Sequence, residues 1–233
     1  MAKDLSRSAQ IHETVGFEFA AYDGGLQPFR YWSESPVAGV HCPACHGVID
    51  HEAISSSVSV RGRYDVSYVD GHLVVSERFR DFCIESGYRD VEFPCIDKRR
   101  SLFELRPTRI VDVDVERSEP IMLGVCLRCG NFDCYLEGRA MFLRVADEPL
   151  DDGFYRTDLI FGCSVGKHPK IVVAPSTREK IVKKGFSRLF FIPIPTIDPE
   201  FEKRKEENTD SEKRELQRLR GNLRWRPKSW IRG

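Results

Sequence analysis

Two cysteine turns, far apart in the sequence, most constrain what this chain can fold into. They are residues 42–45 (Cys-Pro-Ala-Cys) and residues 126–130 (Cys-Leu-Arg-Cys-Gly). Two Cys-x-x-Cys pairs supply four thiolates, the complete ligand set of a closed tetrahedral zinc site. About 80 residues separate the pairs, so one shared ion would join the early chain to its middle. We therefore predict a zinc-ribbon-like element with a long insert, whose structural Zn²⁺ is held by Cys42, Cys45, Cys126 and Cys129.

Two other interpretations of these cysteines remain open. The pairs could be unrelated buried thiols, because free cysteine packs as a small hydrophobic residue. A histidine could also replace one sulfur, because imidazole is a good zinc ligand and His41, His46 and His51 lie near the first turn.

Length, charge and the start of the chain limit the class of protein. The 233 residues allow one large domain or two small ones, and 36 Lys and Arg balance 36 Asp and Glu, so net charge indicates neither nucleic acid nor membrane. No stretch approaches the roughly 18 consecutive apolar residues of a membrane span. The first ten residues are polar, unlike a secretion signal. We expect a cytoplasmic protein whose eight cysteines are reduced or bind metal rather than form disulfides.

An internal repeat is the second organising feature. Residues 73–96 recur without a gap as residues 171–194. Each copy has the pattern of a strand, a helix, a glycine and a second strand, which predicts a duplicated strand–helix–strand unit. The helices are expected to begin at a capping residue and to end at a glycine: Ser76 and Gly87 in the first copy, Ser176 or Thr177 and Gly185 in the second.

Alternating apolar residues elsewhere predict further strands. The segments with this pattern include Phe17–Tyr22, Ser101–Glu116 (two strands), Ile121–Val125, Phe132–Tyr135 and Ala140–Val145. Together with the repeat, they predict an α+β, or mixed α/β, fold with antiparallel-rich sheets. We place this zinc-stapled domain at residues 1–199 and a separate charged tail at residues 200–233.

The tail is basic in its last part and contains two tryptophans. Its candidate contacts with nucleic acid or an acidic partner are Arg218, Arg220, Arg224, Trp225, Arg226 and Trp230. The alternative is a solvated segment, or one whose tryptophans dock on its own domain.

Signals for catalysis are weak, so we expect a protein that is not an enzyme. The chain has no phosphate-binding glycine loop, nucleophile elbow or H-E-x-x-H motif. Cys83 and Cys163 could be nucleophiles beside a histidine, and Cys163 lies five residues before His168. Five acidic residues between 147 and 158 could act as an acid–base pair or bind a cation. A solvated acidic loop and inert thiols explain these residues more simply.

The order of these features resembles the double-CXXCG family, found as multiple paralogues in Myxococcus and related bacteria. The resemblance rests on the turn at 40–45, the turn at 126–130 and a closing block from Asp158 to Pro193. It spans roughly residues 17–195 and leaves the tail unexplained. One departure is visible, because His46 stands where the family motif has glycine.

The resemblance implies an immunity protein of a polymorphic toxin system. Such a protein binds a cognate protein toxin in the cytoplasm, and the four cysteines would hold its zinc. The alternative, based on the turns and the basic tail, is a zinc-ribbon protein that binds nucleic acid or regulates expression. A nucleic-acid binder would lose affinity steeply as salt rises.

Overall fold

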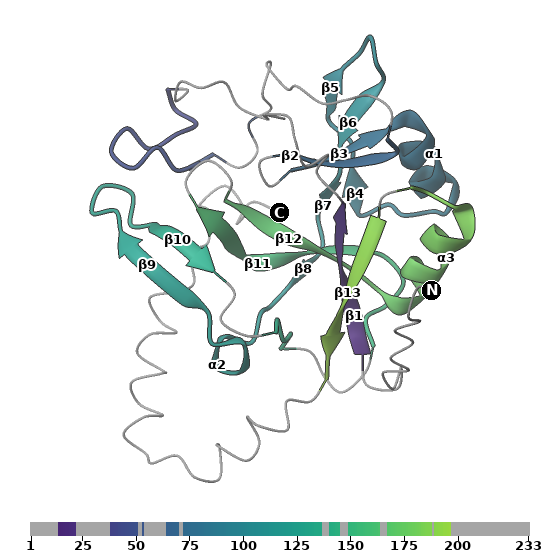
Figure 1. Ribbon diagram of the computed structural model, residues 1–233. Helices are drawn as coiled ribbons and strands as arrows, with labels where there is room; N and C mark the ends of the chain where they lie inside the picture. Colours follow the sequence, from purple (N-terminus) through teal and green to yellow (C-terminus); the bar gives the residue numbers. More distant parts are fainter. Residues whose placement is uncertain are drawn as a thin grey trace, which may run out of the picture.

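A seven-stranded sheet forms the centre of this computed structural model, which describes residues 14–21, 38–50, 53, 64–69, 72–136, 140–144, 149–163, 167–187 and 189–196 (Figure 1). The strands run in the order β13-β1-β12-β11-β10-β9, all antiparallel, and β8 adds a parallel pairing to β11. Their bounds are β1 Thr14–Ala21, β8 Ile110–Val111, β9 Ile121–Val125, β10 Phe132–Leu136, β11 Phe154–Cys163, β12 His168–Val173 and β13 Leu189–Pro195.

A smaller, four-stranded sheet lies beside the large one. It has the order β2-β3-β6-β5 and is antiparallel throughout. Its strands are β2 Val66–Val69, β3 His72–Ser76, β5 Cys95–Asp97 and β6 Leu102–Glu104, and the short β4 Val91–Glu92 pairs with β7 Arg106–Pro107. The described chain is therefore mostly antiparallel sheet with few helices, which confirms the α+β prediction.

Both copies of the repeat contain a strand, a helix and a following glycine, with two departures from the prediction. The second strand of the first copy is divided into the short β4 and β5, which belong to different sheets. Helix α1 (Glu77–Glu85) begins at Ser76, whose hydroxyl accepts from the N–H of Phe79, and Gly87 follows with φ +79°. Helix α3 (Pro175–Lys184) ends at Gly185, φ +68°, but it begins after Ala174 and not at Ser176 or Thr177. Proline at the first position replaces the capping side chain, because the proline ring already has helical φ.

Whether the two copies share an origin stays a prediction, but equivalent residues meet in the same core. Cys83 on α1 and Ile181 on α3, which align in the repeat, are both buried there. Figure 1 shows the two helices on the same side of the sheets. The third helix, α2 (Val115–Ser118), was not predicted and replaces the end of the expected strand at Ser101–Glu116.

Of two further predictions about residues 140–233, one is wrong and the other is not tested. The strand at Ala140–Val145 is wrong: residues 140–144 contribute only an isolated bridge, Leu143 to Val113, and β10 pairs with β9 and β11 instead. The tail at 200–233, with all its candidate contact residues, lies outside the described residues. No helix in the described part of the chain is long and apolar enough to cross a membrane.

Three apolar clusters join these layers. The first packs the helices against both sheets, around Phe19, Phe79 and Val173. The second covers the other face of the large sheet, so β12 is buried on both faces: Val173 lies in the first cluster and its neighbour Val172 in the second. The third contains Val48 and Val74, and it fixes the first cysteine turn to the small sheet.

Asp152 fixes the first turns of α3 through hydrogen bonds to side chains of the helix. Its carboxylate accepts hydrogen bonds from the hydroxyls of Ser176 and Thr177 and from Lys180. Partial burial raises its pKa, but the hydrogen bonds from Lys180, Thr177 and Ser176 outweigh this effect and hold the pKa below its ordinary value. This carboxylate of the acidic segment therefore anchors a helix.

We expect Asp152→Asn to lower the free energy of unfolding by about 1 kcal/mol or less, because the carboxylate is 37% exposed and partly screened. Since the folded pKa is depressed, this stabilisation is present above the unfolded pKa of about 4 and is lost as pH falls through the folded value. Urea unfolding at pH 7 and pH 3 measures both effects. Asp151→Asn, at a neighbouring carboxylate that is 91% exposed, is the control. Equal losses in the two variants would contradict the stabilisation of α3 by Asp152.

Candidate metal centre

The four cysteines of the two turns converge on one point. The sulfurs of Cys42 and Cys126 lie 3.8 Å apart and those of Cys45 and Cys129 lie 3.7 Å apart. All four sulfurs lie within 4.8 Å of one another. Zinc–sulfur bonds of about 2.3 Å in a tetrahedron place sulfurs about 3.8 Å apart. The spacing therefore fits one tetrahedral metal ion.

The two turns have the same backbone geometry although their sequences differ. In the first turn Cys42 N–H donates to Gly47 and His46 N–H donates to Cys42. In the second, Cys126 N–H donates to Asn131 and Gly130 N–H donates to Cys126. Each pair of bonds closes a loop that points two sulfurs in the same direction. The second turn is the loop between β9 and β10, and a bridge between His41 and Val48 closes the first.

The position after the second cysteine requires a left-handed backbone in both turns. Gly130 has φ +73° and His46 has φ +59°. Glycine adopts this conformation without strain, whereas a side chain adds about 1 kcal/mol or more. The exposed His46 thus occupies a position that suits glycine, and the group of four ligands consists of cysteines alone. The alternative in which His46 replaces a sulfur finds no support in this geometry.

The first cysteine of each turn is the more acidic one. Backbone N–H groups of Cys45 and Ala44 lower the pKa of Cys42 to about 6, and those of Cys129 and Arg128 lower the pKa of Cys126. Burial raises the pKa of Cys45, and it raises that of Cys129 to about 12. The turns therefore favour one thiolate each, and a bound cation would supply the charge that keeps the other two deprotonated.

A metal ion here would join the two sheets. The first turn is fixed to the small sheet through the third apolar cluster, which contains Val48 and Val74. The second turn belongs to the large sheet through β9 and β10. A hydrogen bond of 2.7 Å between Tyr68 on β2 and His168 on β12 also connects the sheets. The four-sulfur cluster is thus compatible with a metal ion that holds the two layers together.

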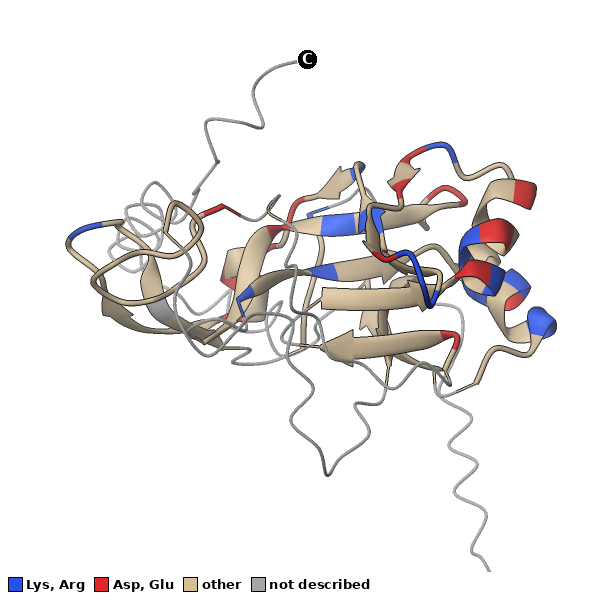
Figure 2. Ribbon diagram, turned by 90° about the horizontal axis from the view of Figure 1, so that it is seen from above, with Lys and Arg blue, Asp and Glu red and all other residues tan. Residues whose placement is uncertain are grey.

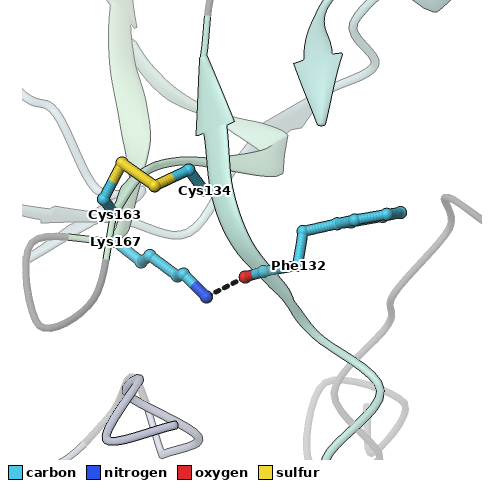
Figure 3. The surroundings of a disulfide bond; sticks show 4 residues. All are labelled: Phe132, Cys134, Cys163 and Lys167. Atoms are coloured by element: carbon cyan, nitrogen blue, oxygen red, sulfur yellow. Dashed lines mark hydrogen bonds between the residues drawn. A yellow bond between two sulfur atoms is a disulfide. The ribbon is translucent and has the colours of Figure 1, made fainter. Parts of the chain in front are cut away.

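Cys163, the thiol weighed as a nucleophile, forms a disulfide with Cys134. The two cysteines lie opposite each other on β11 and β10 (Figure 3). This bond departs from our expectation of reduced cysteines, and no sequence motif indicates it, because it depends on strand register. The other thiol considered, Cys83, is fully buried in the core, and burial raises its pKa.

The described acidic residues between 151 and 158 serve the fold rather than gather at one site. Asp152 anchors α3, and Asp158 accepts the N–H of Val113 at 2.8 Å. Asp151 is almost fully exposed and lies 3.6 Å from Arg109. Asp147 and Glu148 lie outside the described residues.

An exposed apolar stripe next to the second turn was not predicted. Ile121, Leu123 and Val125 alternate along β9 and are each about half exposed, and Leu127 at the tip of the turn is 99% exposed. Strand β9 is the last strand of the sheet in the described chain. Between residues 121 and 136 the only charged residues are Arg128 and Asp133. In Figure 2 the left end of the molecule, which contains β9, shows little of the blue and red that mark charged residues, whereas the helices at the right show much of both.

No protein-family model matches this chain, and a search of curated proteins finds no match either.

Proposed function

We propose that the protein is a cytoplasmic immunity protein that binds a cognate protein toxin, and that one structural Zn²⁺ stabilises it. The observation that carries the proposal is the combination, at one end of the molecule, of a four-sulfur cluster and an exposed apolar edge strand. A site with four thiolate ligands has no open coordination position for a substrate. The metal would therefore stabilise a binding surface.

The stripe of Ile121, Leu123, Val125 and Leu127 has the properties of a protein-binding surface. Exposed contiguous apolar residues mark interaction sites in many proteins. Edge strands are usually protected by charged residues or proline, and β9 contains neither. A partner that adds a strand to β9 would gain main-chain hydrogen bonds and cover these side chains. We assign the cognate toxin to this edge.

Competition between sibling strains tests the proposal. We expect a strain that lacks the protein to be killed by its parent and to be rescued by the wild-type gene. The double variant Leu123→Asp/Val125→Asp should fail to rescue, because it places two charges on the stripe. Ile84→Asp/Val182→Asp, at similarly exposed apolar residues on α1 and α3, is the matched control and should rescue fully.

Zinc content and melting temperature are measured for both double variants, so that failure to fold is recognised. Survival of the strain that lacks the protein would contradict the immunity function. Full rescue by Leu123→Asp/Val125→Asp would show that the toxin binds a surface other than β9.

The second candidate, a nucleic-acid-binding or regulatory protein, rests on the basic tail with Trp225 and Trp230. Its affinity for nucleic acid should fall steeply between low and physiological salt, and removal of residues 200–233 should abolish it. A protein inhibitor should depend much less on salt.

A further inference from the structure

Lys167 is a buried cation beside the cysteine cluster. It directly precedes β12, is 5% exposed, and its ammonium donates a hydrogen bond to the backbone carbonyl of Phe132 (Figure 3). Within the described residues it forms no ion pair with a carboxylate. A buried ammonium without an opposite charge costs several kcal/mol. Some nearby negative charge must therefore offset the burial of this side chain.

The ammonium lies between the two cysteine turns. Phe132 comes just after the second turn, and Gly47 comes just after the first. A Cβ added to Gly47 would lie 3.3 Å from Nζ of Lys167 and 3.5 Å from the sulfur of Cys45. The ammonium and this sulfur therefore border the same small space, which stays open because residue 47 has no side chain.

We propose that Lys167 is the charge partner of the metal-bound thiolates. This inference rests on the proposed zinc site. Four thiolates around one Zn²⁺ leave two net negative charges, and Lys167 would offset one of them in a partly buried setting where electrostatic interactions are strong. Lys167 is a positioning residue that raises the affinity of the site for zinc, and it does not ligate the ion.

If Lys167 offsets the charge of the metal-bound thiolates, the effect of Lys167→Met on stability depends on whether zinc is bound. With zinc bound, the variant loses a favourable interaction with the Cys45 thiolate, whereas without zinc that sulfur carries a proton and less of this interaction exists. We expect zinc affinity to fall about tenfold or more, measured by competition with a chromogenic chelator. The zinc-free variant should lose less stability relative to the wild type than the zinc-bound variant does, measured by urea unfolding.

Two further variants separate this role from simple packing. Gly47→Ala keeps the lysine but places a methyl group against its ammonium, so zinc affinity should fall by a smaller factor. Lys170→Met is the matched control: Lys170 is also partly buried but pairs with Glu18 at 2.7 Å. We expect this control to lower stability equally with and without zinc and to leave zinc affinity unchanged.

Each outcome bears on a separate statement. If the wild-type protein binds no zinc, the zinc site fails and this inference fails with it. If the wild type binds zinc and Lys167→Met binds it equally well, or loses equal stability with and without zinc, only the role of Lys167 is overturned. Should Lys167→Met not fold, an unchanged zinc affinity in Gly47→Ala overturns that role.

Discussion

Cys126→Ser should lose bound zinc and melt roughly 10 °C below the wild-type protein. Cys126 is buried and 3.8 Å from Cys42, so its loss leaves three sulfurs in a site that fits four. Zinc bound to four cysteines contributes its binding energy directly to folding. A loss of about 4 kcal/mol corresponds to about 10 °C in a chain of this length. The effect should be large because the metal would join the small sheet to the large one.

Metal analysis and thermal melting measure the result. Cys95→Ser removes an exposed free cysteine and is the control, with one zinc per chain and an unchanged melting temperature. A strong chelator should bring the wild type down to the level of Cys126→Ser and leave that variant unaffected. One zinc per chain and a wild-type melting curve in Cys126→Ser would disprove the four-cysteine site.

Phe79→Ala should lower the free energy of unfolding by about 3–5 kcal/mol. Phe79 is fully buried on α1 and its ring lies 4.8 Å from that of Phe186 and 5.8 Å from that of Phe19. These contacts connect α1 to the segment after α3 and to β1. Removing the ring leaves a cavity at the point where both copies of the repeat meet the large sheet.

Urea unfolding of the zinc-loaded protein measures this loss. Ile84→Ala, on the same helix but 60% exposed, should change stability by about 0.5 kcal/mol or less. Folded Phe79→Ala should still bind one zinc, which separates this core effect from that of Cys126→Ser. A loss below about 1 kcal/mol would show that the helices contribute little to the common core.

Local patterns predicted the four-cysteine cluster and much of the local structure in residues 73–96 and 171–194. Cys-x-x-Cys spacing is a property of a single turn, so it identifies Cys42, Cys45, Cys126 and Cys129 before any fold is known. The helix start at Ser76 and the glycines that follow both helices are equally local. These features depend on a few adjacent residues, and the structure reproduces them.

Features that depend on tertiary packing were missed. The disulfide between Cys134 and Cys163 requires the register of β10 against β11, and Asp152 accepts hydrogen bonds from Ser176 and Thr177, which lie 24 and 25 residues away in the sequence. The error at Ala140–Val145 has the same origin, because an apolar pattern shows burial without showing which strand pairs with it. Lys167 carries no sequence signal, since its role depends on the distant turns that surround it.

The place of β1 in the large sheet has a consequence for synthesis of the chain. Strand β1 lies between β12 and β13, so both of its neighbours are made last: Phe17 pairs with Val173 and Pro193. At roughly 5–20 residues per second, β1 leaves the ribosome roughly eight to thirty seconds before β12 does. During that time its apolar face has no partner strand. The order of synthesis therefore exposes the first strand to aggregation before it can pair.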